Sequence, residues 1–483
     1  MPLTHRRQIY APDAMVFVRR GATDAASGIN LAAAYARAKT LRPGTSALSA
    51  SNRAVVLIPP GGYSLSSMLT LDTDFVDLVA VAPAMGGPPI DTDVEWTGTV
   101  DAATPVLTHF RPPPTLIYGN LTSTTIAGGA VVTQTANDVR MHGFGIANVS
   151  NPGETDIDSN AETDIYACAF CLSPASSNAA SVYSQMYFWI TGPGIWHTSP
   201  NIWMRQSVYS TKDLEGQWFD CISNGHAYRV TANKKLQAVM HNVIAGPLSW
   251  CGDDTGVAVG ANTRLVNCHG RGIWNLAYQG ASFPAVFVPS GFGCMGCRSY
   301  SCLIEAGATF IDCTFGDKSG GLGRQNSGTW IRCRFGGYSC GGKNLINENF
   351  HAMFDGYAED CVAYADSFGA GSKAGDNCAG TLVRCRLLQL QETMQLDGAE
   401  IRDCYVEVLA TAYEGKIDAL TLIGNGSKIL NSEVRIDTGG AGLPINAASD
   451  YNVAFAHCRF NAAPGAHAVN SIDTPYNVVD DQI

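Results

Sequence analysis

Charged side chains are scarce in this sequence. Its 31 Lys and Arg and 42 Asp and Glu residues make up 15% of the 483 residues, against about a quarter in an ordinary globular protein. The formal net charge is −11, so the acidic surface repels phosphate backbones and we expect no nucleic-acid partner. Because 46% of the residues are hydrophobic, the chain also lacks the composition of a disordered protein.

Long hydrophobic runs are absent as well. No window approaches the roughly 18 uninterrupted apolar residues of a membrane-spanning helix, so we expect no membrane insertion. The first twenty residues begin with basic side chains, but no apolar stretch of about 7–15 residues follows, as it would in a secretory signal. We therefore expect synthesis in a reducing cytoplasm, where cysteines remain thiols.

Cysteine, by contrast, is frequent, and many of the 16 cysteines occur in one repeated frame. In this frame Cys follows a short stretch of alternating apolar and polar residues. From Cys313 to Cys458 the successive intervals are 20, 28, 24, 19, 28 and 26 residues, counting Ser432 as a member. A fixed motif at variable intervals is typical of a β-solenoid, whose loops absorb differences in length. The frame recurs at Cys221, Cys268, Cys313, Cys333, Cys361, Cys385, Cys404, Ser432 and Cys458.

The frame also predicts the direction of the cysteines. Alternation in a strand places Cys313 on one face and its neighbours Asp312 and Thr314 on the other. A small, weakly polar thiol suits a crowded interior row, so we expect inward, reduced thiols. Disulfides between successive rungs are the alternative, but they need specific directions of the Cβ atoms.

The first half of the chain carries shorter signals of the same kind. Residues 54–58 and 76–81 read as buried strands, and the first of these stops at Pro59-Pro60-Gly61-Gly62. Before them, residues 29–41 have a helical pattern that Ser27 can cap. We expect this helix to cover the first rung of the solenoid. Its apolar positions are Ile29, Ala32, Ala33, Ala36 and Leu41.

The order of these elements resembles a known family. Phage tailspike and pectate-lyase-like right-handed β-helix proteins often have a helix after a Gly-x-Thr-Asp stretch, then a strand ending in Pro-Pro-Gly-x-Tyr. This chain has Gly21-Ala22-Thr23-Asp24, the helix, and then a strand that runs into Pro59-Pro60-Gly61-Gly62-Tyr63. Ala25 replaces the second Asp that the family often carries. The close match covers about 45 residues, and the same scaffold serves binders, lyases and hydrolases.

The resemblance implies an all-β fold, a right-handed parallel β-helix with an N-terminal capping helix. We expect an N-terminal arm at 1–25, for attachment or contact between subunits, and a capping helix and linker at 26–53. The β-helix is expected at 54–460 and a C-terminal tail at 461–483. The resemblance further implies side-by-side packing into a homotrimer, and other virion proteins as partners of the arm.

One pair of motifs has residue types suited to cleaving a glycosidic bond. Asp253 and Asp254 lie in Cys-Gly-Asp-Asp, and His269 and Arg271 follow in Cys-His-Gly-Arg. One carboxyl group can protonate the leaving oxygen while the other activates water. The pattern is similar to polygalacturonase-type β-helix hydrolases, which carry Gly-Asp-Asp and Gly-His-Gly on successive rungs. Here the second motif begins with Cys, and 15 residues separate Asp254 from His269, fewer than one rung.

Aromatic side chains are concentrated between residues 187 and 274, and sugar rings stack on such side chains. Trp218, Trp250 and Trp274 are our candidates for substrate binding, with core packing as the alternative use of the same residues. Two other carboxylate groups, around Glu359 and around Glu215, read as solvated loop charges.

Metal and cofactor signals are weak. The Cys-x-x-Cys pairs ending at Cys171 and Cys297 lie too far apart for a usual zinc site. The alternating acids of residues 154–158 lack the Gly and terminal Glu of a Ca²⁺ loop. We therefore expect neither a metal nor a cofactor.

Three functions fit the sequence. The first is a phage tailspike-like virion protein, made in the host cytoplasm, that binds a bacterial surface polysaccharide, with or without depolymerising it. The second is a secreted bacterial polysaccharide hydrolase or lyase of the polygalacturonase or pectate-lyase type. The third is a non-enzymatic structural protein of a virion or cell surface.

Overall fold

The computed structural model describes most of the N-terminal half of the chain and the strands and corners of the remainder. The described residues are 10–82, 113–125, 127–149, 167–190, 205–223, 228–231, 234–243, 263–268, 287–288, 293–295, 298–299, 303–304, 309–315, 329–335, 351–352, 356–365, 367–368, 380–389, 394–396, 398–408, 420–422, 426–436, 445–447, 453–461 and 477–478.

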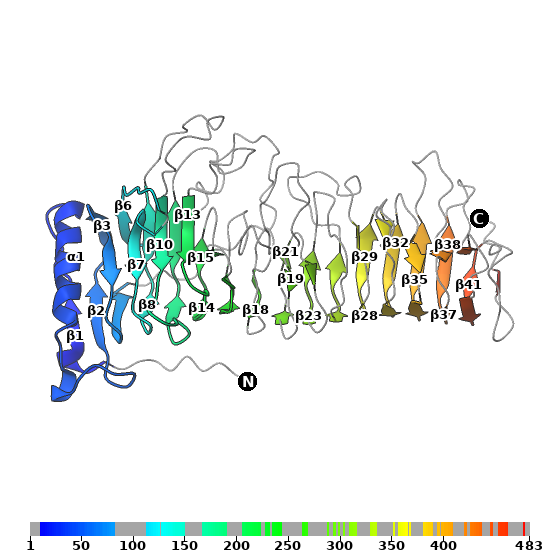
Figure 1. Ribbon diagram of the computed structural model, residues 1–483, viewed down its shortest axis with the longest axis horizontal. Helices are drawn as coiled ribbons and strands as arrows, with labels where there is room; N and C mark the ends of the chain where they lie inside the picture. Colours follow the sequence, from blue (N-terminus) through cyan, green and yellow to red (C-terminus); the bar gives the residue numbers. More distant parts are fainter. Residues whose placement is uncertain are drawn as a thin grey trace, which may run out of the picture.

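One parallel sheet runs along the whole molecule (Figure 1). We call this sixteen-stranded sheet the long sheet; its neighbouring strands are separated in the chain by other strands or by loops, as stacked coils require. Its strands are β1 (Met15–Phe17), β2 (Ala54–Ile58), β5 (Val76–Ala80), β8 (Arg140–His142), β11 (Val182–Ser184), β14 (Gln217–Phe219), β17 (Val239–His241), β18 (Arg264–Val266), β20 (Gly293–Met295), β23 (Thr309–Ile311), β25 (Thr329–Ile331), β28 (Tyr357–Glu359), β31 (Thr381–Val383), β34 (Glu400–Arg402), β37 (Ser427–Leu430) and β40 (Val453–Ala456).

A second set of parallel strands follows the long sheet through a corner. It forms a five-stranded sheet and, further along the chain, a nine-stranded sheet, which together we call the second sheet. The strands of the first part are β3 (Gly61–Leu65), β6 (Thr115–Gly119), β9 (Gly145–Asn148), β12 (Tyr187–Ile190) and β15 (Ile222–Ser223). Those of the other part are β21 (Arg298–Ser299), β24 (Thr314–Phe315), β26 (Arg334–Phe335), β29 (Val362–Ala365), β32 (Arg386–Gln389), β35 (Tyr405–Val408), β38 (Glu433–Ile436), β41 (Arg459–Phe460) and β42 (Asn477–Val478).

The remaining strands form a third set. Between β2 and β16 the chain passes repeatedly through the long, second and third sheets, and neighbouring strands of all named sheets pair in parallel. The described structure is therefore an all-β fold of stacked parallel strands, as the repeated frame predicts. The third set contains β4 (Leu69–Leu71), β7 (Ala130–Gln134), β10 (Ala167–Leu172), β13 (Arg205–Ser210), β16 (Arg229–Val230), β19 (Phe287–Val288), β22 (Leu303–Ile304), β27 (His351–Ala352), β30 (Ser367–Phe368), β33 (Met394–Leu396), β36 (Leu420–Leu422) and β39 (Ile445–Ala447).

The corner between the long and second sheets is one residue in the left-handed backbone region, followed by an inward side chain. Asp312 has a φ of 54°, and its N–H donates to Ile331 O on the next rung at 2.9 Å. Asp and Asn tolerate this conformation better than most residues, which explains their frequency before the cysteines. The other such corner residues are Gln185, Asp220, Asn242, Asn267, Arg332, Asp360, Arg384, Asp403, Asn431 and His457.

This corner corrects one detail of the sequence interpretation. The Cys does not lie within a continuous strand, because the strand ends before the corner residue and a new strand begins after the Cys. The inward direction of the thiols is nevertheless confirmed, since Cys313 and Cys333 are each only 1% exposed. The ten described cysteines are all buried and free, as expected. They are Cys168, Cys171, Cys221, Cys268, Cys313, Cys333, Cys361, Cys385, Cys404 and Cys458.

The first helix, α1 (Asp24–Ala38), lies at one end of the long sheet (Figure 1). Its buried side chains include Leu31, Ala34 and Tyr35, which join the same core as strands β1 to β3. Close packing requires Gly28, because a Cβ there would lie 1.9 Å from Ser64 O. Two short 3-10 helices, η1 (Pro12–Ala14) and η2 (Pro43–Thr45), flank this region.

The helix differs in phase and bounds from the predicted one. Thr23, not Ser27, caps its N-terminus, by accepting a hydrogen bond from Ala26 N at 3.2 Å. Ser27 is buried within the first turns, and Ile29, predicted to face the core, is 70% exposed. The many alanines give little contrast between faces, so the pattern could not fix the phase.

The segments around Gly21–Asp24 and Pro59–Tyr63 are joined by side-chain contacts in the fold. Arg20 donates to Gly62 O at 2.5 Å, and its guanidinium lies over the Tyr63 ring, 5.3 Å from the centroid. Tyr63 is fully buried and donates to Pro59 O at 2.7 Å, as an inward corner aromatic should. Asp24 accepts from Tyr118 of β6 at 3.0 Å. The motif therefore joins the helix end to the first rungs.

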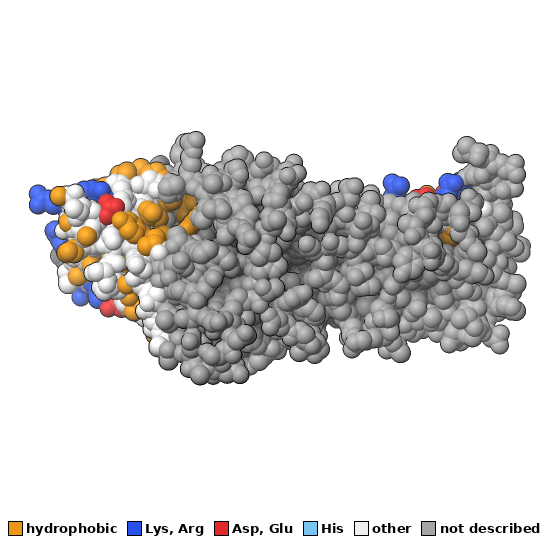
Figure 2. All heavy atoms as spheres, turned by 90° about the horizontal axis from the view of Figure 1, so that it is seen from above, with side chains coloured by type: hydrophobic (Ala, Val, Ile, Leu, Met, Phe, Trp, Pro, Cys, Tyr) orange, Lys and Arg blue, Asp and Glu red, His pale blue; other side chains and the backbone are white. Residues whose placement is uncertain are grey.

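The N-terminal third of the described chain carries several exposed apolar side chains, and Figure 2 shows orange side chains over this end. Phe17 on β1 and Ile29 on α1 are the most exposed, at 66% and 70%. Met68, Val81 and Val149 are exposed to 39–52%. No helix among the described residues is long and apolar enough to cross a membrane.

The burial of the cysteines generates a prediction about their reactivity. We expect native protein to react very slowly with iodoacetamide at all ten described cysteines, because the thiolate is the nucleophile and burial disfavours it. Burial raises the pKa of Cys221 to about 12, for example. Peptide-resolved mass spectrometry after timed alkylation would measure each rate, with protein unfolded in guanidinium as the fully labelled control. Rapid native labelling of Cys313, Cys333 or Cys361 would contradict the inward assignment.

Candidate functional site

Most of the residues predicted to form a catalytic site lie outside the described residues. This applies to Asp253, Asp254, His269 and Arg271, and also to Trp250 and Trp274. Their assignment stays a prediction.

Trp218 is described, and the structure corrects its predicted role. It is fully buried in β14, and its indole ring stacks on Tyr183 at a centroid distance of 4.0 Å. Tyr228 packs edge-on against the indole at 5.1 Å, and the indole N–H donates to Glu215 O at 3.0 Å. No face of the ring is left for a sugar. The density of aromatic residues here reflects core packing, because a Trp buries a large apolar area.

The carboxylates around Glu215 are engaged within the fold. Asp213 accepts from Lys235 N at 2.9 Å and from the Gln237 side chain at 2.6 Å. Glu215 accepts a hydrogen bond from Ser177. These acids fix loops between neighbouring rungs, so Asp213 and Glu215 are hydrogen-bonded within the fold and are not merely solvated loop charges.

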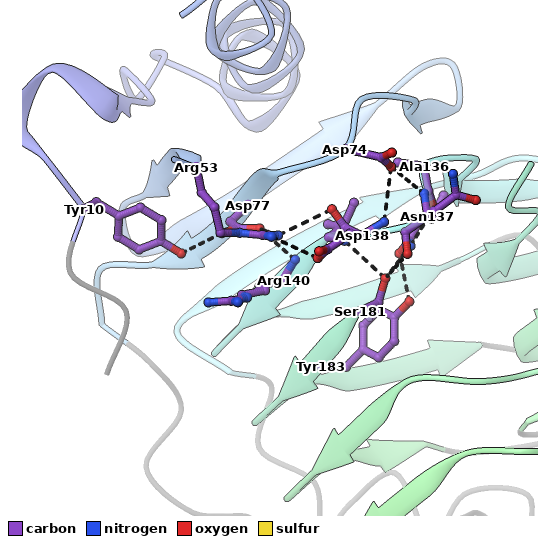
Figure 3. A network of polar contacts seen from close by, with 12 residues as sticks. Tyr10, Arg53, Asp74, Asp77, Ala136, Asn137, Asp138, Arg140, Ser181 and Tyr183 are labelled. Atoms are coloured by element: carbon purple, nitrogen blue, oxygen red, sulfur yellow. Dashed lines mark hydrogen bonds and ion pairs between the residues drawn. The ribbon is translucent and has the colours of Figure 1, made fainter. Parts of the chain in front are cut away.

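A buried ion cluster joins three successive strands of the long sheet (Figure 3). Arg53, which precedes β2, donates to both oxygens of Asp77 in β5, at 2.6 and 2.7 Å. Its third nitrogen lies 2.9 Å from Asp138 Oδ1, just before β8. Tyr10 donates to Asp77 Oδ2 at 2.8 Å. The cluster therefore links Tyr10 to the first three coils.

The electrostatics of this cluster indicate a structural role. The side chains of Arg53 and Asp77 have no exposed surface, and such charges persist only when paired and hydrogen-bonded. Burial raises the pKa of Asp138, although the Arg53 guanidinium opposes the effect. Burial, together with the nearby Asp77 carboxylate, also raises the pKa of Tyr10 far above its ordinary value. With its carboxylates held by Arg53, the cluster offers no group to a substrate.

The polar network extends along the rungs beyond the ion cluster (Figure 3). Asp74 Oδ1 accepts from the backbone N–H of Asn137 at 2.6 Å and of Asp138 at 3.2 Å. Ser181 accepts from Val139 N at 3.1 Å and donates to Asn137 O at 3.2 Å. These bonds satisfy backbone groups at the loop before β8 and so hold Asp138 in place.

A line of alternating charges runs along the outer side of the corner. Arg332 binds both oxygens of Asp312 on the preceding rung, at 2.7 and 2.8 Å. Arg384 binds Asp360 in the same way, at 2.7 and 3.1 Å, and also contacts Glu359. Beside this line, Arg386 and Tyr405 directly follow a Cys and start the second-sheet strands β32 and β35, and their side chains are exposed or half-buried.

The outward residues of β32, β35 and β38 form a surface suited to a hydroxylated ligand. The register places Arg386 beside Tyr405 and Tyr405 beside Glu433, while Glu407 lies beside Arg435. We call these five residues the Tyr405 surface. Rigid strands hold them, and an aromatic ring with a few fixed polar groups is a common way to bind small polar ligands.

Contacts within the Tyr405 surface hold its side chains in place. Tyr405 donates to Glu407 at 2.9 Å, and the Arg386 guanidinium lies over the Tyr405 ring, 5.4 Å from its centroid. Glu433 Oε1 lies 3.6 Å from Arg435 Nη1. Burial and the hydrogen bond to Glu407 raise the pKa of Tyr405, so its hydroxyl stays neutral. The surface thus presents cationic donors, carboxylate acceptors and a partly exposed ring.

Sequence reasoning missed the Tyr405 surface. Its residues on successive rungs are separated by 19–28 positions and form no motif. The signal was the Cys frame itself, because Arg386 and Tyr405 directly follow a Cys and lie beside each other on successive rungs.

Comparisons with known proteins give no family assignment. No protein-family model matches the chain, and no curated protein matches it. Among solved structures, it is similar to DFA-IIIase from Arthrobacter chlorophenolicus A6 without its lid, with 10% identity and a TM-score of 0.28, over 95% of this chain and 96% of that chain.

Two further solved structures are similar at the same level. The pectin methylesterase PemA from Erwinia chrysanthemi has 11% identity and a TM-score of 0.28, over 78% of this chain and 89% of that chain. The Dettilon tailspike protein has 11% identity and a TM-score of 0.26, over 95% of this chain and 68% of that chain. At these scores the fold assignment rests on the strand pairing alone.

The buried ion cluster gives a prediction about stability. We expect Arg53→Met to lower the free energy of unfolding by about 3–5 kcal/mol, because it leaves buried carboxylates without their cation. Chemical denaturation would measure the loss, with the exposed helix residue Arg37 changed to Met as the matched control.

The loss should also depend on pH. A carboxyl group whose folded pKa is raised, as at Asp138, binds its proton more tightly in the folded state, so it adds stability as the pH falls through that pKa. Removing Arg53 strengthens this effect, so the deficit of Arg53→Met should be smaller near pH 5 than near pH 8. A small deficit, independent of pH, would contradict the assignment.

Proposed function

We propose that this protein is a phage tailspike-like virion protein that binds a bacterial surface polysaccharide on the lateral face of a right-handed parallel β-helix. The repeated passage through three parallel sheets supports a closed solenoid from about residue 54 to 460. The position of α1 at one end of the long sheet supports its role as a cap over the first rung. Residues 1–25 would then form the attachment arm and residues 461–483 a tail.

The observation that carries the binding proposal is the Tyr405 surface. A polysaccharide offers hydroxyl groups and flat ring faces in a regular row, and a solenoid offers side chains that repeat every rung, roughly 4.8 Å apart. Arg386 and Arg435 supply donors, Glu407 and Glu433 supply acceptors, and Tyr405 supplies a ring. Arginines next to acids also suit a glycan that carries carboxylate groups.

The predicted cleavage site remains part of the proposal. If the protein cuts its glycan, Asp253 and Asp254 are the candidates for acid and base, with His269 and Arg271 assisting. Depolymerisation that Asp253→Asn or Asp254→Asn abolishes would favour an enzyme.

Two other functions remain distinguishable by experiment. Isolation of the protein from culture supernatant instead of virions would favour a secreted bacterial hydrolase or lyase. Incorporation into a virion without glycan binding would favour a purely structural protein.

The binding proposal predicts the effects of substitutions on the Tyr405 surface. We expect Tyr405→Ala and Arg386→Ala each to weaken binding at least about tenfold, since each removes a ring or a charged donor that ligand contact requires. Tyr405→Phe should retain more binding than Tyr405→Ala because the ring remains. An array of bacterial capsular and lipopolysaccharide glycans would identify the ligand and rank the variants.

Arg37→Ala, an exposed arginine on α1, is the matched control. Glycan binding by the unchanged protein that all three Tyr405-surface variants preserve would place the ligand elsewhere. The absence of binding to every glycan on the array would contradict the proposal.

The same proposal predicts a homotrimer. Exposed Phe17, Ile29, Met68, Val81 and Val149 lie in the N-terminal third, and burial between subunits would remove their apolar surface from water. Cyclic threefold symmetry would close such an assembly. Light scattering at micromolar concentration should give about three times the chain mass of 51.2 kDa. A stable monomeric mass would contradict the trimer.

A further inference from the structure

Five cysteines occupy the same inward position on five consecutive rungs. The strands on either side fix this alignment: Ile311 pairs with Ile331, and Arg334 pairs with Val362. The next rung carries Ser432 and the one after it Cys458. The row therefore has four adjacent thiol pairs, while Ser432 separates Cys458 from them. We call the five cysteines the thiol row: Cys313, Cys333, Cys361, Cys385 and Cys404.

The thiols of the row lie on neighbouring rungs, one above the next. The thiols of Cys333, Cys361, Cys385 and Cys404 each donate to a backbone carbonyl oxygen of the preceding rung, at 3.4–3.6 Å. Backbone N–H groups also point at sulfur: Cys333 N donates to Cys361 Sγ at 3.4 Å, and Cys385 N to Cys404 Sγ at 3.3 Å. The members are only 1–3% exposed. The row is a dry column of sulfur atoms.

This arrangement selects against the common metals of cysteine sites. Among the residues that the structure describes, no three His, Cys, Asp or Glu side chains converge as ligands for one ion. A tetrahedral Zn²⁺ site needs four. A linear site needs only two sulfurs, and thiolates favour soft ions such as Cu(I).

The rung spacing fits a linear site. A zinc–thiolate bond is about 2.3 Å long, and two metal–sulfur bonds of similar length placed end to end span about 4.6 Å, close to the separation of about 4.7–4.9 Å between neighbouring strands. We propose that the thiol row binds monovalent soft metal ions, Cu(I) or Ag(I), each held by two sulfurs of successive rungs. This site is separate from the Tyr405 surface and does not depend on the proposed function.

Binding is a proton displacement without a change of oxidation state. Each ion takes the place of one thiol proton, which leaves to solvent, and accepts a lone pair from the sulfur of the next rung. Four ions can bridge the five sulfurs while one end thiol keeps its proton, so the filled row is neutral. Because protons compete with the metal, uptake should fall with decreasing pH.

The chain itself suggests a conservative variant. Ser432 already occupies the row position, and its hydroxyl accepts from Cys404 N at 3.1 Å and donates to Leu430 O at 2.7 Å. Serine therefore fits this corner and keeps its hydrogen bonds. Cys361→Ser should fold and should break the row into two separate pairs.

The experiment is a titration of the reduced full-length protein with silver nitrate in chloride-free buffer, followed by native mass spectrometry. Relative to the unchanged protein, Cys361→Ser should bind two fewer ions at saturation because it removes two adjacent pairs. Ser432→Cys should bind two more, because it joins Cys458 to the row. Cys458→Ser should bind the same number and is the matched control. An ultraviolet thiolate-to-silver absorption band should change in proportion.

Several results would overturn the proposal. Equal uptake by the unchanged protein, Cys361→Ser and Ser432→Cys would mean that silver binds at other cysteines. A loss of one ion in both Cys361→Ser and Cys458→Ser would indicate binding to isolated thiols instead of adjacent pairs. Conversion of the row to disulfides before metal is added would also exclude it, and the intact mass would reveal this. Circular dichroism of each variant before titration would establish that it is folded.

Discussion

The structure depends on one repeated corner, in which a residue with left-handed backbone is followed by a small inward side chain. At Asp312 the chain leaves the long sheet, turns, and places Cys313 in the core before the second sheet begins. The corner N–H bonds to the next rung, so each corner fixes the position of its neighbour. Strands stack in parallel register where the same change of direction recurs at the same place, as it does in most of the described coils.

The corner places a buried position and a solvent-facing position on consecutive residues. The side chain just after the left-handed residue enters a dry interior, where only small or apolar groups fit. In β32, β35 and β38 the next side chain, Arg386, Tyr405 or Glu433, is exposed or half-buried, and the three lie on neighbouring strands. A change of one residue in register would exchange the two rows. The inner row and the outer surface are therefore both consequences of the same corner.

The sequence predicted the features that repeat and failed on those that do not. The Cys frame identified the rungs, the inward thiols and the parallel stacking. A motif that keeps the same local spacing can be recognised from the sequence alone. It could not predict the corner backbone, since alternation alone suggests a continuous strand. The phase of α1 was wrong because alanines on several faces leave only Leu31 and Tyr35 to mark the buried side.

The candidate site was harder to predict than the fold because direction matters more than composition there. Trp218 belongs to a cluster of aromatic residues typical of sugar sites, yet its ring is enclosed by Tyr183 and Tyr228. The Tyr405 surface has an ordinary composition. It can be identified only from the strand register, which places residues about one rung apart side by side. Register, and not residue density, identifies a surface on a solenoid.

Charged residues near the N-terminus and along the later corners contribute to the same fold in different ways. Near the N-terminus, Arg53 is buried between Asp77 and Asp138, and the three strands depend on its presence. Along the later corners the charged residues are solvent-exposed, so each pair contributes little to stability because water screens it. Their order still matters: Asp and Arg alternate on successive rungs, whereas like charges at one strand spacing would repel. The outer line thus favours the native order of rungs, while the buried thiol row, being uncharged, imposes no such order.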